Sequence, residues 1–96
     1  MRGGDGEPGW KCDATLAGHH CRAVYSVDWS RAGMLATGGG DDTIRVFKEG
    51  SDGWECEVTS SNSHDMDINC VSWNPKDSDL LASCSDDETV RLWSIE

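Results

Sequence analysis

The sequence predicts an all-β fold built from two copies of one unit, and three observations support this prediction. The chain aligns with itself at an offset of 44, which pairs Trp10 with Trp54, His20 with His64 and Trp29 with Trp73. Apolar residues alternate or form short runs bounded by Gly, Asp, Ser and Pro, which is typical of short β-strands. No stretch shows the periodicity of apolar residues that is typical of a helix of useful length. A register this consistent indicates an internal repeat.

Each copy is expected to contain four strands. The first set is expected near residues 10–16, 24–29, 34–38 and 43–48, and the second near 54–59, 68–73, 80–84 and 89–95. Beyond Trp73 the offset grows to 46, because the second copy carries two further residues between Lys76 and Asp79, where a turn belongs. Eight short strands separated by turn residues predict antiparallel and mostly local pairing.

The two copies resemble WD40 repeats, which have a period of about 40–45 residues and four strands per unit. The second copy carries the resemblance in His64, Ile68, Val71, the run Trp73-Asn74-Pro75 and the run from Leu80 to Trp93, LLASCSDDETVRLW. The first copy carries it in the run Leu16 to His20, then Val24, Val27 and Trp29, and then Leu35 to Thr37 and Asp41 to Phe47. The copies depart from the pattern at Phe47, Ser94 and Ser63, where Trp, Asp and Gly are usual.

This resemblance implies blades of a β-propeller, with WD40 repeats at residues 10–53 and 54–96 after a flexible Gly-rich tail or inter-blade loop at 1–9. Two repeats make an incomplete propeller, because closure needs at least about four blades. In a WD40 repeat the first strand is the outer strand of the preceding blade. The strand at 10–16 is therefore expected either to complete the second blade or to pair with another copy, which would be strand-edge self-association.

Several stretches resemble one subfamily, the WD40 proteins of cytosolic iron-sulfur protein assembly, in the last two repeats of their propeller. These stretches are residues 10–12, 40–47, 69–76 and 80–87. The resemblance implies a non-enzymatic scaffold that docks targeting-complex subunits or client apoproteins, so that clusters reach extramitochondrial proteins. It also implies a cytoplasmic location and allows a nuclear one in addition. The competing interpretation is a WD40 adaptor of another pathway.

Composition narrows the classes of partner. The chain has 18 acidic against 8 basic residues and a formal charge of -10 without a basic stripe, which argues against nucleic acid and anionic membranes as partners. Residues 1–9 lack the apolar core of a secretory signal, and no apolar stretch could cross a bilayer, so a soluble intracellular protein is expected. Five irregularly spaced cysteines favour free thiols in a reducing compartment.

Three polar residues of the second copy allow two interpretations. By type, His64, Ser83 and Asp87 could form a hydrolase triad. The WD40 resemblance implies instead two buried hydrogen-bond networks, formed by His64, Ser83, Asp87 and Trp93 and by His20, Thr37 and Asp41, where Phe47 cannot donate. Buried polar groups cost a few kcal/mol when unpaired, so such networks hold blades together. No nucleophile elbow accompanies the set, and catalysis is not expected.

No metal or cofactor is expected. No two cysteines lie closer than nine positions and no Cys-x-x-Cys occurs, while Cys70 and Cys84 are expected to be buried thiols inside strands. The run Gly38 to Gly40 lacks the following helix of a phosphate cradle and favours a tight turn.

Partner contacts are expected at the loop ends on the face that carries the histidine loops. The candidates are Arg22, Tyr25, Asp67, Asn69 and Asp86.

Overall fold

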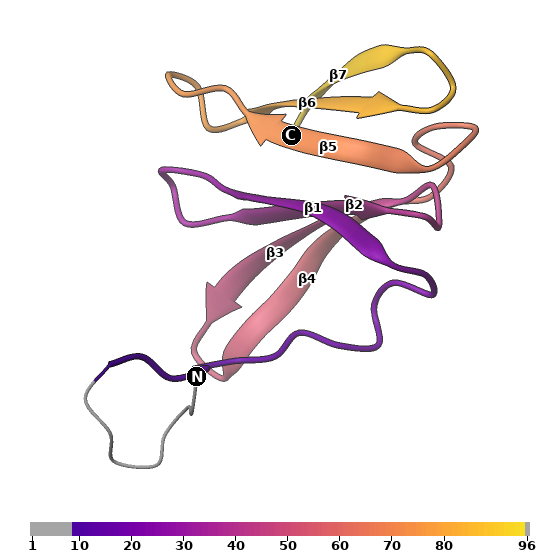
Figure 1. Ribbon diagram of the computed structural model, residues 1–96. Helices are drawn as coiled ribbons and strands as arrows, with labels where there is room; N and C mark the ends of the chain where they lie inside the picture. The colour runs from indigo at the N-terminus through magenta and orange to yellow at the C-terminus, as the bar shows by residue number, and fades with distance from the viewer. Residues whose placement is uncertain (1–8, 96) are drawn as a thin grey trace.

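The computed structural model describes residues 9–95 and contains two antiparallel sheets stacked on one another (Figure 1). The first sheet has the order β1-β2-β3-β4 and consists of Val24–Trp29, Leu35–Gly39, Ile44–Gly50 and Gly53–Ser60. The second has the order β5-β6-β7 and consists of Ile68–Trp73, Leu80–Ser85 and Val90–Ser94. The described residues contain no helix, and so none that could span a membrane, and the predicted all-β class is confirmed. Of the tail expected at 1–9, residues 1–8 lie outside the described part.

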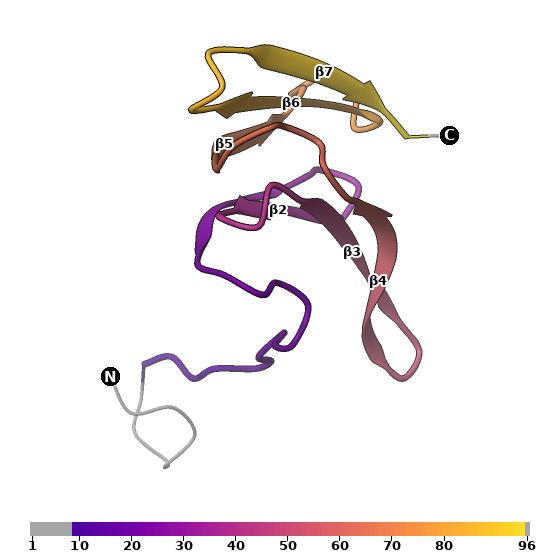
Figure 2. The ribbon, with the colours of Figure 1, turned by 90° about the vertical axis from the view of Figure 1, so that its right-hand side faces the viewer.

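The prediction of a strand at residues 10–16 is wrong, whereas the other seven expected strands are present within two residues of their expected ends. A strand is defined by its ladder partner, and residues 10–16 lie beside no strand edge with which they pair. The segment does not complete the second blade either, because β7 pairs with β6 alone among the described strands. Figure 2 shows the segment at the opposite end of the molecule from β7.

The core lies between the two sheets because alternate side chains of each strand point to opposite faces. The buried residues of this cluster are Ala36, Ile44 and Val46 from the first sheet and Ile68, Val71, Trp73 and Leu81 from the second. A Cβ atom on Gly38 would come within 2.6 Å of the Ile68 Cγ2 atom, so the close approach of β2 to β5 requires glycine there. Gly38 therefore lies inside β2 and not in the expected tight turn, and it has a packing role between the sheets.

Polar side chains of β1 join the two sheets at one edge. The Val71 N–H donates to Ser26 Oγ at 3.0 Å, and the Trp73 backbone N–H donates to Asp28 Oδ2 at 2.6 Å. The Trp73 indole N–H donates to the Asp28 carbonyl at 3.0 Å. These bonds satisfy the free edge of β5 and fix the second sheet relative to the first.

Candidate functional site

A relay of hydrogen bonds ties the loop before β5 to the turn between β6 and β7. The Trp93 indole donates to Ser83 Oγ at 2.9 Å, Ser83 Oγ lies 2.7 Å from His64 Nε2, and His64 Nδ1 lies 3.0 Å from Asp87 Oδ2. A carboxylate only accepts, so His64 donates from Nδ1 to Asp87. In the neutral imidazole Nε2 is then an acceptor, and Ser83 donates to it while accepting from Trp93.

Asp87, at the loop end of this relay, accepts hydrogen bonds from several groups. One carboxylate oxygen accepts from the Thr89 hydroxyl at 2.6 Å and from the Thr89 backbone N–H at 3.0 Å. The other accepts from the Asp65 backbone N–H at 3.1 Å as well as from His64. The sequence reasoning missed Thr89, although its spacing from Asp87, repeated by Asp41 and Thr43, is a signal for a local carboxylate turn.

The first copy holds a shorter version of the network. His20 Nε2 lies 2.6 Å from Thr37 Oγ1, and His20 Nδ1 lies 2.9 Å from Asp41 Oδ2. Phe47 stands where the second copy has the donating tryptophan, and its buried ring packs edge-on against His19 with ring centres 4.8 Å apart. The structure thus brings together all seven predicted network residues, and their contribution to stability stays a prediction.

Both aspartates of these networks have lowered pKa values. The pKa of Asp87 is held well below its ordinary range chiefly because the Thr89 hydroxyl donates to the ionised carboxylate; burial opposes this, and the His64 bond and backbone donors reinforce it. For Asp41, burial raises the pKa, but the hydrogen bond and the charge of His20, together with backbone donors, outweigh burial and lower it. Both carboxylates are therefore held as anions.

Removing the Asp87 charge is expected to change how stability depends on pH. Because the folded-state pKa lies below the unfolded value of about 3.9, ionised Asp87 stabilises the fold above that pH, and the contribution is lost as pH falls through the folded pKa. In Asp87→Asn, urea unfolding midpoints should therefore be lower at neutral pH and fall less steeply than wild type between about pH 5 and 2. Asp86→Asn is the neighbouring exposed control. Parallel curves for wild type and Asp87→Asn would contradict the assignment.

Ser83, His64 and Asp87 have the hydrogen-bond order of a hydrolase triad, but they are not accessible as one. Ser83 is 2% exposed, His64 is fully buried, and the Trp93 indole N–H already lies on the serine oxygen. A substrate carbonyl therefore has no path to Ser83 Oγ. The arrangement favours a structural role for the three residues.

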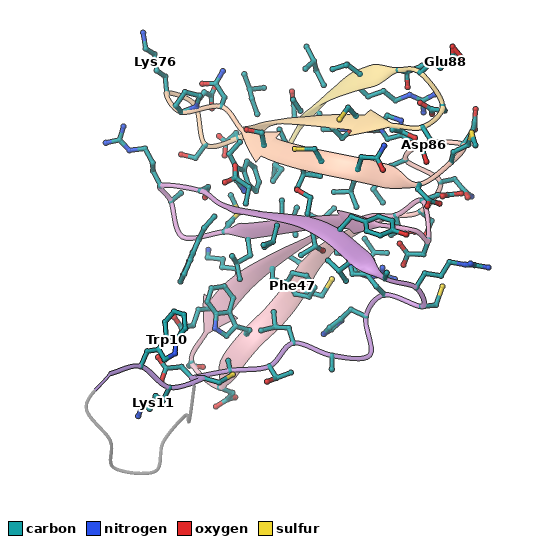
Figure 3. The ribbon with its side chains drawn as sticks, in the orientation of Figure 1. Trp10, Lys11, Phe47, Lys76, Asp86 and Glu88 are labelled. Carbon is teal, nitrogen blue, oxygen red and sulfur yellow. The ribbon has the colours of Figure 1, made fainter. Side chains whose placement is uncertain are left out.

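The five candidate contact residues gather at the loop ends of the two copies. Tyr25 and Arg22 are exposed and flank Gly40. Asn69 Nδ2 donates to Asp86 Oδ1 at 2.7 Å on the exposed surface, and the Asp86 N–H donates to the carbonyl of half-buried Asp67 at 3.1 Å. Figure 3 shows Asp86 and Glu88 at this end of the second sheet and Lys76 at the other. The repeat places Tyr25 and Asn69 at equivalent positions, so each copy presents a different polar side chain from the same place.

Neither of the two cysteines expected to be buried, Cys70 and Cys84, is fully buried. Cys70 is exposed and not a buried thiol, because it lies on the outer face of the second sheet, opposite half-buried Cys84 in the ladder. All five cysteines are free thiols. Between residues 9 and 95 no group of three or more His, Cys, Asp or Glu side chains is arranged to hold a metal ion.

Comparison with known proteins places this geometry in a family. The model of the WD domain, G-beta repeat family matches residues 10–48 and 54–94. The chain is 45% identical over 91 residues to the probable cytosolic iron-sulfur protein assembly protein CIAO1 homolog of Nematostella vectensis, which covers 88% of this chain and 28% of that protein. It is 49% identical over 94 residues to CIAO1 of Rattus norvegicus, covering 91% and 28%. The chain thus spans less than a third of these curated relatives.

A solved structure agrees with the fold. A chain in the crystal structure of the Mitotic Checkpoint Complex superimposes with a TM-score of 0.54 at 18% identity, covering 80% of this chain and 37% of that one. At this identity the likeness concerns the fold alone.

Proposed function

The chain belongs to the WD40 repeat family, and from this premise we propose that it is a non-enzymatic scaffold of cytosolic iron-sulfur protein assembly. The relatives that carry the CIAO1 name support the choice of pathway and a cytosolic location. The proposed units are the repeats at 10–53 and 54–96. The proposed partners are subunits of the targeting complex or client apoproteins.

One observation carries the docking role: exposed side chains stand on loop ends that buried networks hold in place. Asn69 donates a hydrogen bond to Asp86, which directly precedes Asp87 of the relay with His64. Tyr25 occupies the position of Asn69 in the first copy. Rigid display of this kind lowers the entropy cost of binding a partner. The burial of Ser83 supports the non-enzymatic part of the proposal over a hydrolase.

The docking role predicts that a loop-end variant loses partner binding. Tyr25→Ala/Asn69→Ala/Asp86→Ala should weaken binding at least about tenfold, since a minority of interface residues, among which tyrosine is enriched, cost more than about 1 kcal/mol each when truncated to alanine. Biolayer interferometry on the immobilised chain would measure the affinity for purified targeting-complex subunits and for a purified cytosolic apoprotein that accepts a cluster.

Lys76→Ala, at the opposite end of the sheet, is the matched control and should bind as wild type. Equal affinity of the triple variant and wild type would overturn the loop end as the docking face. Absence of binding to every one of these iron-sulfur proteins would instead overturn the pathway and favour a WD40 adaptor of another one.

A further inference from the structure

The ladder between β5 and β6 places two cysteines directly opposite one another. Cys70 of β5 and Cys84 of β6 are ladder partners, and both strands belong to the second copy. Side chains of ladder partners point to the same face of the sheet, with Cβ atoms about 4.5–5.5 Å apart. This proximity comes from the pairing of the two strands and does not depend on what lies against either face of the sheet.

The hydrogen bonds of β5 identify the kind of ladder site at which the two cysteines meet. The backbone N–H groups of Val71 and Trp73 donate to side chains of β1 and so point away from β6. Successive N–H groups of a strand point to opposite sides, so the Cys70 N–H points toward β6 and the two cysteines form a hydrogen-bonded pair. The Cα atoms of such a pair are about 5.5 Å apart, inside the range of about 4.4–6.8 Å found in disulfides. The backbone positions therefore allow a bridge.

The remaining adjustment is small and falls where the ladder is already irregular. The Cβ atoms of a disulfide are about 3.5–4.5 Å apart, so the two side chains must approach one another slightly. The register shifts between Ile68 and Cys70, which leaves Asn69 between them without a ladder partner. A strand bends and twists more strongly at such a point, so β5 can adjust there without disturbing a regular ladder on both sides. Residual strain makes a bridge of this kind easier to reduce.

The two thiols differ in their access to solvent. Cys70 is exposed, and its Sγ atom has a weak contact of 3.7 Å with the Val71 carbonyl oxygen. Cys84 is half-buried. Oxidation-sensitive sites combine an accessible thiol with a neighbouring thiol that resolves the first product. Cys70 therefore has the position of the attacking thiol and Cys84 that of the resolving thiol.

The other three cysteines, all within the described residues, have no cysteine opposite them. Cys56 of β4 lies opposite Phe47 in the ladder. Cys12 and Cys21 lie outside the described strands. The fold thus singles out one pair of the five free thiols.

We propose that Cys70 and Cys84 are a redox modification site, at which a small oxidising disulfide such as glutathione disulfide forms a bridge between β5 and β6. The Cys70 thiolate attacks one sulfur of glutathione disulfide, which forms a mixed disulfide and releases one glutathione thiolate. The Cys84 thiolate then attacks the Cys70 sulfur and releases the second glutathione thiolate. The protein gives up two electrons and two protons, which leave with the two glutathione thiols. Excess reduced glutathione reverses both steps.

The sequence supplies a matched comparison for this bridge, because Cys70 lies 14 positions from Cys56 and 14 positions from Cys84. In the unfolded chain the cost of closing a loop depends on its length, so bridges from Cys70 to either cysteine should form about equally. In the folded chain only Cys84 is the ladder partner of Cys70. The ratio of the two bridges therefore measures the effect of the fold alone.

The full 96-residue chain would be equilibrated with glutathione disulfide at neutral pH, alkylated, digested with trypsin and analysed by tandem mass spectrometry. Trypsin cuts after Lys76, so the bridge from Cys70 to Cys84 joins two peptides, whereas one from Cys70 to Cys56 stays within one peptide. The bridge to Cys84 should exceed the bridge to Cys56 at least about tenfold in buffer, and the two should be about equal in concentrated urea.

Two serine variants are the controls. Cys84→Ser should leave Cys70 as a mixed disulfide with glutathione, whereas Cys56→Ser should form the bridge to the same extent as wild type. Equal amounts of the two bridges in buffer, or a wild-type chain that carries only mixed disulfides, would overturn the proposal. The docking role is decided separately, because no partner takes part in this measurement.

Discussion

Trp73→Ala is expected to lower the free energy of unfolding by about 3–5 kcal/mol, the range found when a buried tryptophan is truncated to alanine. Trp73 is 6% exposed and lies in the cluster between the sheets, and its indole N–H donates to the Asp28 carbonyl a hydrogen bond that alanine cannot make. A chain of 96 residues has a total stability of roughly 5–14 kcal/mol. The variant should therefore unfold at much lower urea or be partly unfolded in water, as measured by far-ultraviolet circular dichroism.

The repeat supplies a matched control, because Trp29 occupies the position of Trp73 in the first copy. Trp29 is 64% exposed, and its ring meets Trp54 edge-on with centres 5.9 Å apart. Trp29→Ala should cost about 1 kcal/mol or less. Equal losses in the two variants would show that burial between the sheets does not account for the role of Trp73.

The repeat made most of the fold predictable, because each strand carries its own alternation and its own bounding turn residues. The segment at 10–16 has the same local pattern as β4, yet only β4 is a strand, since only β4 lies beside a partner edge. Cys70 illustrates the same limit. Its strand was predicted, but its exposure depends on whether another sheet covers that face. Pairing and burial on outer faces are properties of neighbours and not of local sequence.

The residues of the buried networks could be predicted from the sequence, whereas the contacts between the copies and at the loop ends could not. The buried networks were implied by the WD40 resemblance, and their residues recur at equivalent repeat positions, such as His20 with His64. The link from Asp28 to Trp73 was not predicted, because it joins different copies through a backbone edge that no sequence pattern marks. The hydrogen bond between Asn69 and Asp86 also depends on loop geometry. A repeat alignment identifies conserved geometry within a unit and carries little information on contacts between units.

His64→Ala is expected to cost about 3 kcal/mol, because it leaves a cavity and removes the acceptor for the Ser83 hydroxyl and one donor to Asp87. His64 is fully buried, so water does not readily replace the ring. Urea unfolding at neutral pH would measure the loss. The double variant with Asp87→Asn should lose less than the sum of the single variants, because both changes break the same hydrogen bond.

His20→Ala is the matched comparison within the same molecule and should cost only about 1–2 kcal/mol. His20 lines an open groove of about 370 Å³, so water can take the place of its ring. After the substitution, Asp41 also retains its ion pair with the Arg45 guanidinium, at 3.3 Å. In the second copy the Arg91 guanidinium lies farther from Asp87, at 3.9 Å. If His20→Ala proved as costly as His64→Ala, solvent access and the alternative cation would not govern these networks. The expected order instead assigns the stronger tie to the second copy, where the relay runs unbroken from Trp93 to Asp87 and supports the loop that presents Asn69 and Asp86.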